Sequence, residues 1–156
     1  MMFLDSTYLI GVILKKDTYT KQSLELKPLL KNEKKLINNT VFNEVLNSLS
    51  STNSEYDVDT LTDLLLSYQI DFLTKDDYAD AISLFKYYNH AINFSDCTIL
   101  KTMQNNKINT IVSFDSDFDK ISGINRIYIW LNDFLIILLV TILYLIIFIS
   151  IFSFID

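Results

Sequence analysis

The stretch Ile111–Ile121 has the sequence IVSFDSDFDKI and is the most informative part of this chain. Its first half suits a short buried strand, and its second half carries three aspartates at alternate positions. Alternating acids also open a calcium loop of the EF-hand type, but that loop needs Gly at position 6 and Glu at position 12. Lys120 and Arg126 occupy those positions, which argues against an EF-hand. A solvated acidic turn is the simple alternative until other acids are located.

On both sides of this stretch, short apolar segments alternate with segments of helical periodicity. We expect strands at about 1–4, 34–39, 69–74, 109–115 and 126–130, and helices at about 6–14, 18–31, 40–50, 59–68, 75–89 and 93–107. Pro28 should bend or interrupt the second helix. Strands that alternate with helices pair in parallel through right-handed crossovers. The sequence therefore predicts a three-layer α/β/α sandwich around a parallel sheet of about five strands.

Two of the expected helices have clear apolar faces. The helix at 40–50 places Val41, Val45, Leu46 and Leu49 on one side. The helix at 75–89 should begin with a capping box between Thr74 and Asp77. The residues expected to be buried on this second helix are Tyr78, Ala81, Ile82, Phe85 and Tyr88.

Composition excludes several kinds of chemistry. The chain has 156 residues, which suits one domain with a sizeable core, and it has one cysteine, Cys97, and one histidine, His90. A lone cysteine forms no internal disulfide, so a reducing, cytoplasmic setting is expected. A lone histidine excludes a multi-histidine zinc centre. The net charge of −6 argues against nucleic-acid binding by the whole surface. Any catalysis should therefore rest on carboxylates.

The C-terminal segment differs from the rest of the chain. Residues 134–155 carry no charge, and 18 of these 22 are Leu, Ile, Val or Phe. A helix of this length spans about 33 Å, enough for a bilayer core of about 30 Å. We expect a transmembrane helix at 134–155 that anchors a cytoplasmic domain at 1–131, because the nearby basic residues precede it. A frameshifted end and a buried core element are the alternatives, since AT-rich DNA read in a wrong frame yields similar runs.

Four acids should meet at one edge of the sheet. Ligands of open parallel sheets bind beyond the carboxyl ends of the strands, where the strand order reverses. Asp5 and Asp115 follow the first and fourth strands, whereas Glu44 and Asp96 lie in early turns of helices that can start at that edge. Carboxylates gathered there repel one another and raise one another's pKa unless a cation is present. Oxygen-only ligands favour Mg²⁺ or Mn²⁺ over zinc.

Four segments of the chain resemble the signature segments of PIN domains, and especially of the VapC-type toxin ribonucleases. These segments are MFLDSTYLIG, VFNEVLN, NFSDCTIL and IVSFDSDFDKI, and their order and spacing match over about residues 1–130. The resemblance implies a catalytic set formed by Asp5, Glu44, Asp96 and Asp115. It implies metal ligation by Asp5, Asp96, Asp115 and Asp117. It also gives Ser113 a role in assisting the substrate, whereas Asp119 is expected to be a surface charge.

The resemblance further implies Mg²⁺- or Mn²⁺-dependent hydrolysis of RNA phosphodiester bonds by the toxin of a type II toxin–antitoxin pair. An antitoxin protein, an RNA substrate and a second copy of the chain are the implied partners, and the membrane is a further one through residues 134–155. A non-catalytic PIN-like scaffold tethered to the membrane is the alternative. A phosphoacceptor receiver domain also gathers acids at strand ends, but it needs a lysine after the last strand, where this chain continues with WLND.

Overall fold

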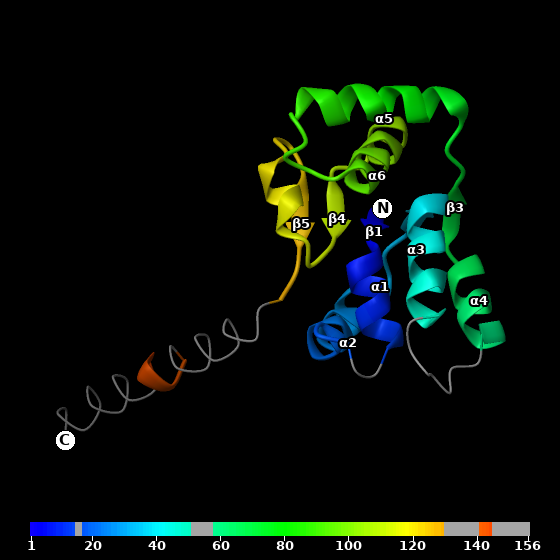
Figure 1. The fold of residues 1–156 in the computed structure, drawn as a ribbon. Helices are drawn as coiled ribbons and strands as arrows, with labels where there is room; N and C mark the ends of the chain where they lie inside the picture. Colours follow the sequence, from blue (N-terminus) through cyan, green and yellow to red (C-terminus); the bar gives the residue numbers. More distant parts are fainter. Residues whose placement is uncertain (15–16, 51–57, 130–140, 145–156) are drawn as a thin grey trace, which may run out of the picture.

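The computed structural model of the chain describes residues 1–14, 17–50, 58–129 and 141–144 (Figure 1). Its strands are β1 (Met2–Leu4), β2 (Lys35–Asn38), β3 (Gln69–Asp71), β4 (Thr110–Val112) and β5 (Asn125–Ile127). Its helices are α1 (Ser6–Ile13), α2 (Thr20–Leu29), α3 (Asn39–Ser50), α4 (Val58–Leu66), α5 (Lys75–Tyr87), α6 (Phe94–Asn105) and the 3₁₀ turn η1 (Ser116–Lys120). The predicted α/β fold is confirmed.

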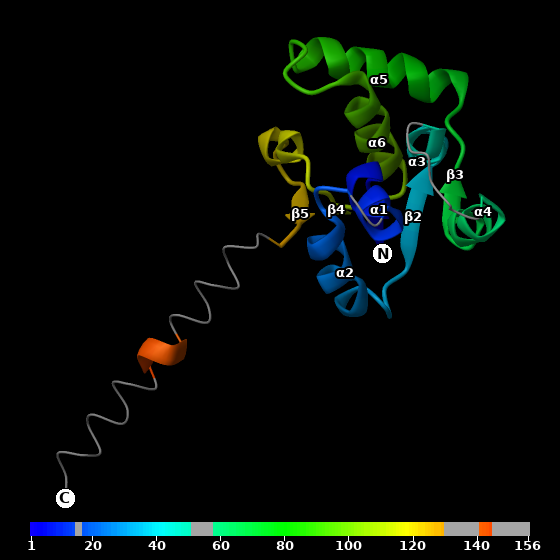
Figure 2. The same ribbon diagram turned by 60° about the horizontal axis from the view of Figure 1, so that its bottom comes forward.

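All neighbouring strands of the sheet pair in parallel, in the order β3-β2-β1-β4-β5. Figure 2 shows β4 and β5 on one side of the centre and β2 and β3 on the other. The chain builds outward from β1 to β3 and then returns to add β4 and β5 on the opposite side of β1. The strand order therefore reverses between β1 and β4, which is where an open sheet of this kind binds ligands.

Helices cover the two faces of the sheet. Figure 1 shows α5 and α6 above the strands and α1 and α2 below them. The switch of face follows from handedness: the β3-to-β4 connection travels back across the sheet, and a right-handed crossover then lies on the face opposite the earlier ones. The predicted three-layer arrangement around five parallel strands is thus the observed one.

The core lies on both faces of the central strands. Phe3 and Leu4 on β1, and Ile111 and Val112 on β4, have no or almost no exposed surface. The apolar face predicted for α3 is also present, with two of its residues fully buried and two partly buried against the core. Buried strands of this kind read as continuous apolar runs because helices pack on both of their sides. The core fixes the register that positions the site.

The buried face predicted for α5 is partly wrong. Of the five residues, Ala81 is buried and Phe85 and Tyr88 are partly buried, whereas Tyr78 and Ile82 are 36% and 45% exposed. The helix packs mainly against α6 rather than on the sheet. A helix in an outer position needs only a narrow apolar stripe, so the wide stripe in the sequence overstates its burial.

Two smaller expectations also change. Pro28 lies in the last turn of α2, which ends at Leu29 rather than at about residue 31 as expected. The strands are three or four residues long, shorter than their apolar runs. In contrast, the capping box between Thr74 and Asp77 is present as predicted.

In the part of the chain that the structure describes, no helix has the length and apolar character needed to cross a bilayer. The predicted transmembrane helix at 134–155 lies outside the described residues except for 141–144, which are helical. That helix stays a prediction.

We expect Gly11→Ala to destabilise the protein by about 1–3 kcal/mol, the usual cost of overpacking. A Cβ at this position would lie 2.2 Å from the Ser23 hydroxyl oxygen and 3.0 Å from the Tyr19 carbonyl oxygen. Ser23 is fully buried, so it has no room to move away. Urea denaturation measures the loss, and Lys34→Ala, at an exposed position before β2, is the control. An unchanged midpoint for Gly11→Ala would contradict the close packing of α1 on α2.

Candidate metal centre

Asp5 lies at the carboxyl end of β1, directly before α1. Its main-chain N–H donates to the carbonyl of Val112 at 3.1 Å, so the pairing of β1 with β4 extends to this residue. The Asp5 side chain is 3% exposed, and it makes no capping hydrogen bond to α1 although it occupies the N-cap position. Helix capping therefore does not account for this buried carboxylate.

Two hydroxyl groups hold one oxygen of the Asp5 carboxylate. Thr7 Oγ1 and Ser113 Oγ donate to Asp5 Oδ2 at 2.5 and 2.7 Å. The same hydroxyls accept from the main chain after β4: Thr7 from the Phe114 N–H at 3.0 Å, and Ser113 from the Asp115 N–H at 2.9 Å. The two hydroxyls thus tie the loop that carries Asp115 to Asp5.

Three carboxylates come together beside this pair of strand ends. Asp96, Asp115 and Asp117 each offer an oxygen within 4.8 Å of the oxygens offered by the other two. Asp96 is 4% exposed, whereas the other two are partly buried. We call this group the acid trio. It joins the N-terminus of α6 to the turn after β4, which are far apart in the sequence.

Each carboxylate of the acid trio is oriented through one oxygen. Asp96 Oδ2 accepts from the Asn93 N–H at 3.2 Å, as the second half of a capping box that starts α6. Asp115 Oδ1 accepts from the Asp117 N–H at 2.8 Å, and Asp117 Oδ1 accepts from the Lys120 ammonium at 2.5 Å. Among the described residues, the second oxygen of each carboxylate accepts no hydrogen bond. Each acid thus keeps one oxygen for a ligand.

Two acids of the site, Asp96 and Asp5, have raised pKa values. Burial, followed by the charges of Asp115 and Asp5, raises the pKa of Asp96 to about 7. Burial also raises the pKa of Asp5, against the lowering effect of the Thr7 and Ser113 hydroxyls, and the charge of Glu44 adds to the rise. The mutual repulsion predicted from the sequence thus contributes at Asp96 and Asp5, where burial is the larger cause.

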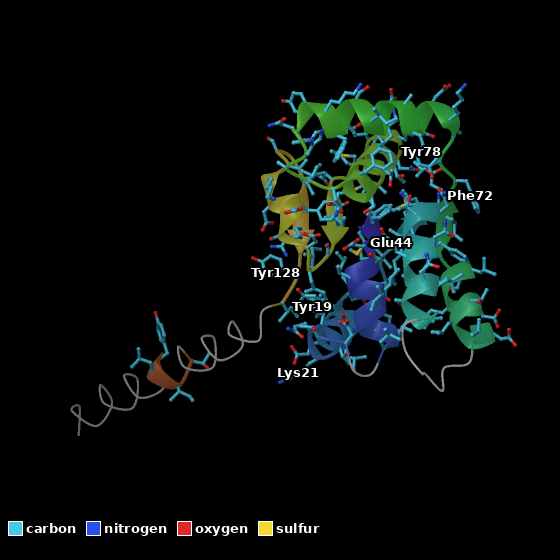
Figure 3. All side chains as sticks on the ribbon, viewed as in Figure 1. Tyr19, Lys21, Glu44, Phe72, Tyr78 and Tyr128 are labelled. Atoms are coloured by element: carbon cyan, nitrogen blue, oxygen red, sulfur yellow. The ribbon has the colours of Figure 1, made fainter. Side chains whose placement is uncertain are left out.

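Glu44 stands apart from the acid trio. It lies on α3, partly buried, and Figure 3 places it beside α1. It is close enough to Asp5 to influence the ionisation of that residue. Of the predicted residues, the structure therefore brings Asp96, Asp115 and Asp117 into one cluster, with Asp5 next to it and Glu44 at its margin.

Sequence reasoning missed the basic residues that hold the turn η1. Arg126 on β5 donates through two nitrogens to the two carboxylate oxygens of Asp119, at 2.8 and 2.5 Å, and through a third to the Ser113 carbonyl at 3.3 Å. Its side chain is 3% exposed. This anchor fixes the turn that carries two of the trio, and Lys120 pairs with Asp117 on the same turn. Because Asp117 and Lys120 are three residues apart, their spacing could have predicted the ion pair between them.

The donor set fits a hard divalent cation. All three ligand groups are carboxylates, which suit Mg²⁺ and Mn²⁺ better than softer metals. Cys97 adjoins Asp96 but is fully buried, and burial raises the pKa of its thiol to about 11. His90 is exposed and packs against Phe85 instead. A positive charge at this site would offset both the burial of Asp96 and its repulsion by Asp115 and Asp5.

A parallel sheet with an acid trio at its reversal point defines a class of metal-binding α/β domains. Within that class the chain is a PIN domain: the model of the PIN domain family matches residues 2–124, which is most of the described chain. The resemblance predicted from the four sequence segments is thereby confirmed. No curated protein matches the chain by sequence.

Several solved structures share the fold. VapC20 of Mycobacterium tuberculosis, a toxin that cleaves the sarcin–ricin loop, superposes with a TM-score of 0.73 at 17% identity, covering 83% of this chain and all of that one. A toxin–antitoxin complex from Klebsiella pneumoniae superposes with a TM-score of 0.62 at 19% identity, and the match covers 80% of this chain and 96% of that one. VapBC2 of Rickettsia felis, bound to promoter DNA, superposes with a TM-score of 0.62 at 18% identity, and the match covers 83% of this chain and 100% of that one.

We expect Ser113→Ala to weaken Mn²⁺ binding by about 10- to 100-fold, the range found for residues that orient metal ligands. The substitution removes a donor to Asp5 and an acceptor for the Asp115 N–H. Isothermal titration calorimetry measures the affinity. Ser83→Ala is the matched control, since that hydroxyl only donates to the Ala79 carbonyl on the exposed side of α5. An affinity within twofold of the wild type would show that Ser113 does not position the ligands.

Proposed function

We propose that this protein is a metal-dependent endoribonuclease that hydrolyses RNA phosphodiester bonds. The observation that carries the proposal is the acid trio, Asp96, Asp115 and Asp117, with ligand oxygens within 4.8 Å of one another at the point where the strand order reverses. Without a cation, such a cluster of carboxylates destabilises the fold through repulsion. The match to the PIN domain family supports a metal ion as the reason for the cluster.

We assign the roles by position. Asp96, Asp115 and Asp117 hold one Mg²⁺ or Mn²⁺ ion, and the buried Asp5 completes the ligand set from β1. We also assign Glu44 to the catalytic set. It lies at the margin of the site, and its charge adds to the negative field around Asp5.

Ser113 acts through its neighbours. It is fully buried, so we propose that it assists the substrate by fixing Asp5 and Asp115 rather than by touching RNA.

The chemistry divides between the ion and the chain. When bound, a divalent ion supplies a Lewis acid that polarises the phosphate and makes an attacking water more acidic. The chain contributes fixed oxygens: a hydrogen bond at a helix start orients Asp96, and one within the turn η1 orients Asp115. Asp96 must lose its proton to act as a ligand, and near neutral pH it is poised to do so because its pKa is about 7. A carboxylate cluster without a cation would repel phosphate, so the ion is required for substrate binding as well.

The toxin of a type II toxin–antitoxin pair is the biological role we propose. Its support is the fold, since the structures that resemble this chain include toxins and toxin–antitoxin complexes. We propose an antitoxin protein as the regulatory partner and a homodimer as the assembly. The proposed nuclease domain spans residues 1–131, and we place it in the cytoplasm, where a free buried thiol such as Cys97 is usual. Membrane attachment through residues 134–155 remains a separate proposal.

The test is an RNA cleavage assay on the full chain, purified in mild detergent. We expect endonucleolytic products with Mg²⁺ or Mn²⁺, none with EDTA, and none with Asp96→Asn. Activity that persists in EDTA or in the variant would contradict the proposed mechanism. Absence of cleavage under every metal, in a chain that binds Mn²⁺, would instead favour the non-catalytic scaffold.

A further inference from the structure

Lys120 places a positive charge directly on the acid trio. Its ammonium donates to Asp117 Oδ1 at 2.5 Å and to the Ala91 carbonyl at 2.9 Å. Asp117 is one of the three proposed ligands, and Ala91 lies in the loop between α5 and α6, just before Asp96. One lysine therefore bridges the two segments that supply the trio.

This ion pair differs from the others among the described residues. The remaining pairs join Lys101 to Asp80, Arg126 to Asp119 and the N-terminal amine to Glu33, none of which belongs to the trio. Within the described ranges, Lys120 is thus the single basic residue in an ion pair with a proposed metal ligand.

We propose that Lys120 is a built-in competitor of the divalent ion. In the metal-free protein its ammonium partly neutralises the trio through Asp117. An ion that binds the trio through the second oxygen of Asp117 repels the ammonium, and Lys120 then withdraws toward the Ala91 carbonyl and solvent. The Lys120 side chain is half exposed, so it has space to move. This inference rests on the proposed function, because it concerns the affinity of the same metal centre.

The competition should lower the metal affinity measurably. A unit charge about 4 Å from a divalent ion, both in a medium like water, changes its affinity by about thirtyfold. Withdrawal of the side chain relieves most of this repulsion. We therefore expect Lys120→Met to bind Mn²⁺ about fivefold more tightly than the wild type at low salt, with a smaller difference at high salt, where exposed charges are screened.

Isothermal titration calorimetry with Mn²⁺ on the full chain tests the inference. Lys34→Met is the matched control. It removes the same charge from an exposed residue at the amino end of β2, whereas the trio lies at the carboxyl ends of the strands. Lys120→Gln is a second neutral variant that keeps a donor for the Ala91 carbonyl. We expect both Lys120 variants to bind more tightly than the wild type, and Lys34→Met to match it.

Thermal melting gives a second readout that does not depend on activity. In EDTA, Lys120→Met should melt below the wild type, because the trio loses its internal cation. The Mn²⁺-induced rise in melting temperature should then be larger in the variant than in the wild type. Variants that bind Mn²⁺ as the wild type does, or more weakly, would overturn the competitor role. Failure of the wild type itself to bind Mn²⁺ is a distinct result, since it would overturn the proposed metal centre.

Discussion

Asp96→Asn is expected to reduce RNA cleavage by at least about a thousandfold and to stabilise the metal-free protein. Three orders of magnitude correspond to about 4 kcal/mol, in line with the several kcal/mol that a catalytic metal contributes. Asp96 is the most buried member of the acid trio, so it constrains the ion most strongly. Asparagine keeps an oxygen for the Asn93 N–H, so the helix start should survive the change.

The gain in stability follows from the ionisation of Asp96. A rise of its pKa from 3.8 to about 7 corresponds to about 4 kcal/mol of destabilisation when the group is charged. Structural relaxation around the charged group leaves about 1–3 kcal/mol as the expected gain. Urea denaturation in EDTA at pH 8 measures it. Asp76→Asn, on the exposed first turn of α5, is the control with no expected gain. Loss of stability in Asp96→Asn would show that the carboxylate is not under repulsion.

The second large effect is an unusual dependence of stability on pH in the absence of metal. The pKa of Asp96 is higher in the folded protein than in the unfolded chain, so the folded state binds more protons between pH about 4 and about 7. Stability on this account is highest near pH 4 and falls as pH rises through 7. Asp5 acts in the same direction, since its pKa is also raised. Asp77 and Asp119 have lowered pKa values, and their contributions change only below pH about 4.

Urea denaturation in EDTA at several pH values from 4.5 to 7.5 measures this trend. The wild type should lose stability across the window, and Asp96→Asn should lose much less. Saturating Mn²⁺ should reverse the slope, because protons compete with the ion for the same carboxylate. The same slope in wild type and variant would mean that Asp96 does not titrate in this range.

The sequence was informative where local rules and the global fold agree. Asp5 and Asp115 could be placed at one edge because parallel strands end together there, and the reversal of strand order between β1 and β4 brings those ends side by side. Asp96 could be placed because a helix start carries a recognisable capping pattern. These inferences needed only periodicity and chain direction.

The remaining features depend on contacts that no local pattern encodes. Thr7 lies in the first turn of α1, yet its hydroxyl joins Asp5 to the loop after β4 across more than 100 residues of sequence. The turn η1 is held by Arg126 from the next strand, so its place beside Asp96 depends on sheet pairing. The exposed side of α5 was missed because an apolar stripe does not reveal how much of it a partner covers.

The central position of β1 has a consequence for synthesis on the ribosome. This strand is made first, but one of its two neighbours in the sheet, β4, is made only after more than 100 further residues. Asp115 and Asp117 follow β4, so a nascent chain holds a single member of the trio until late in translation. A prematurely terminated product that ends before residue 115 would therefore lack the proposed metal centre, even if its first helices had already formed.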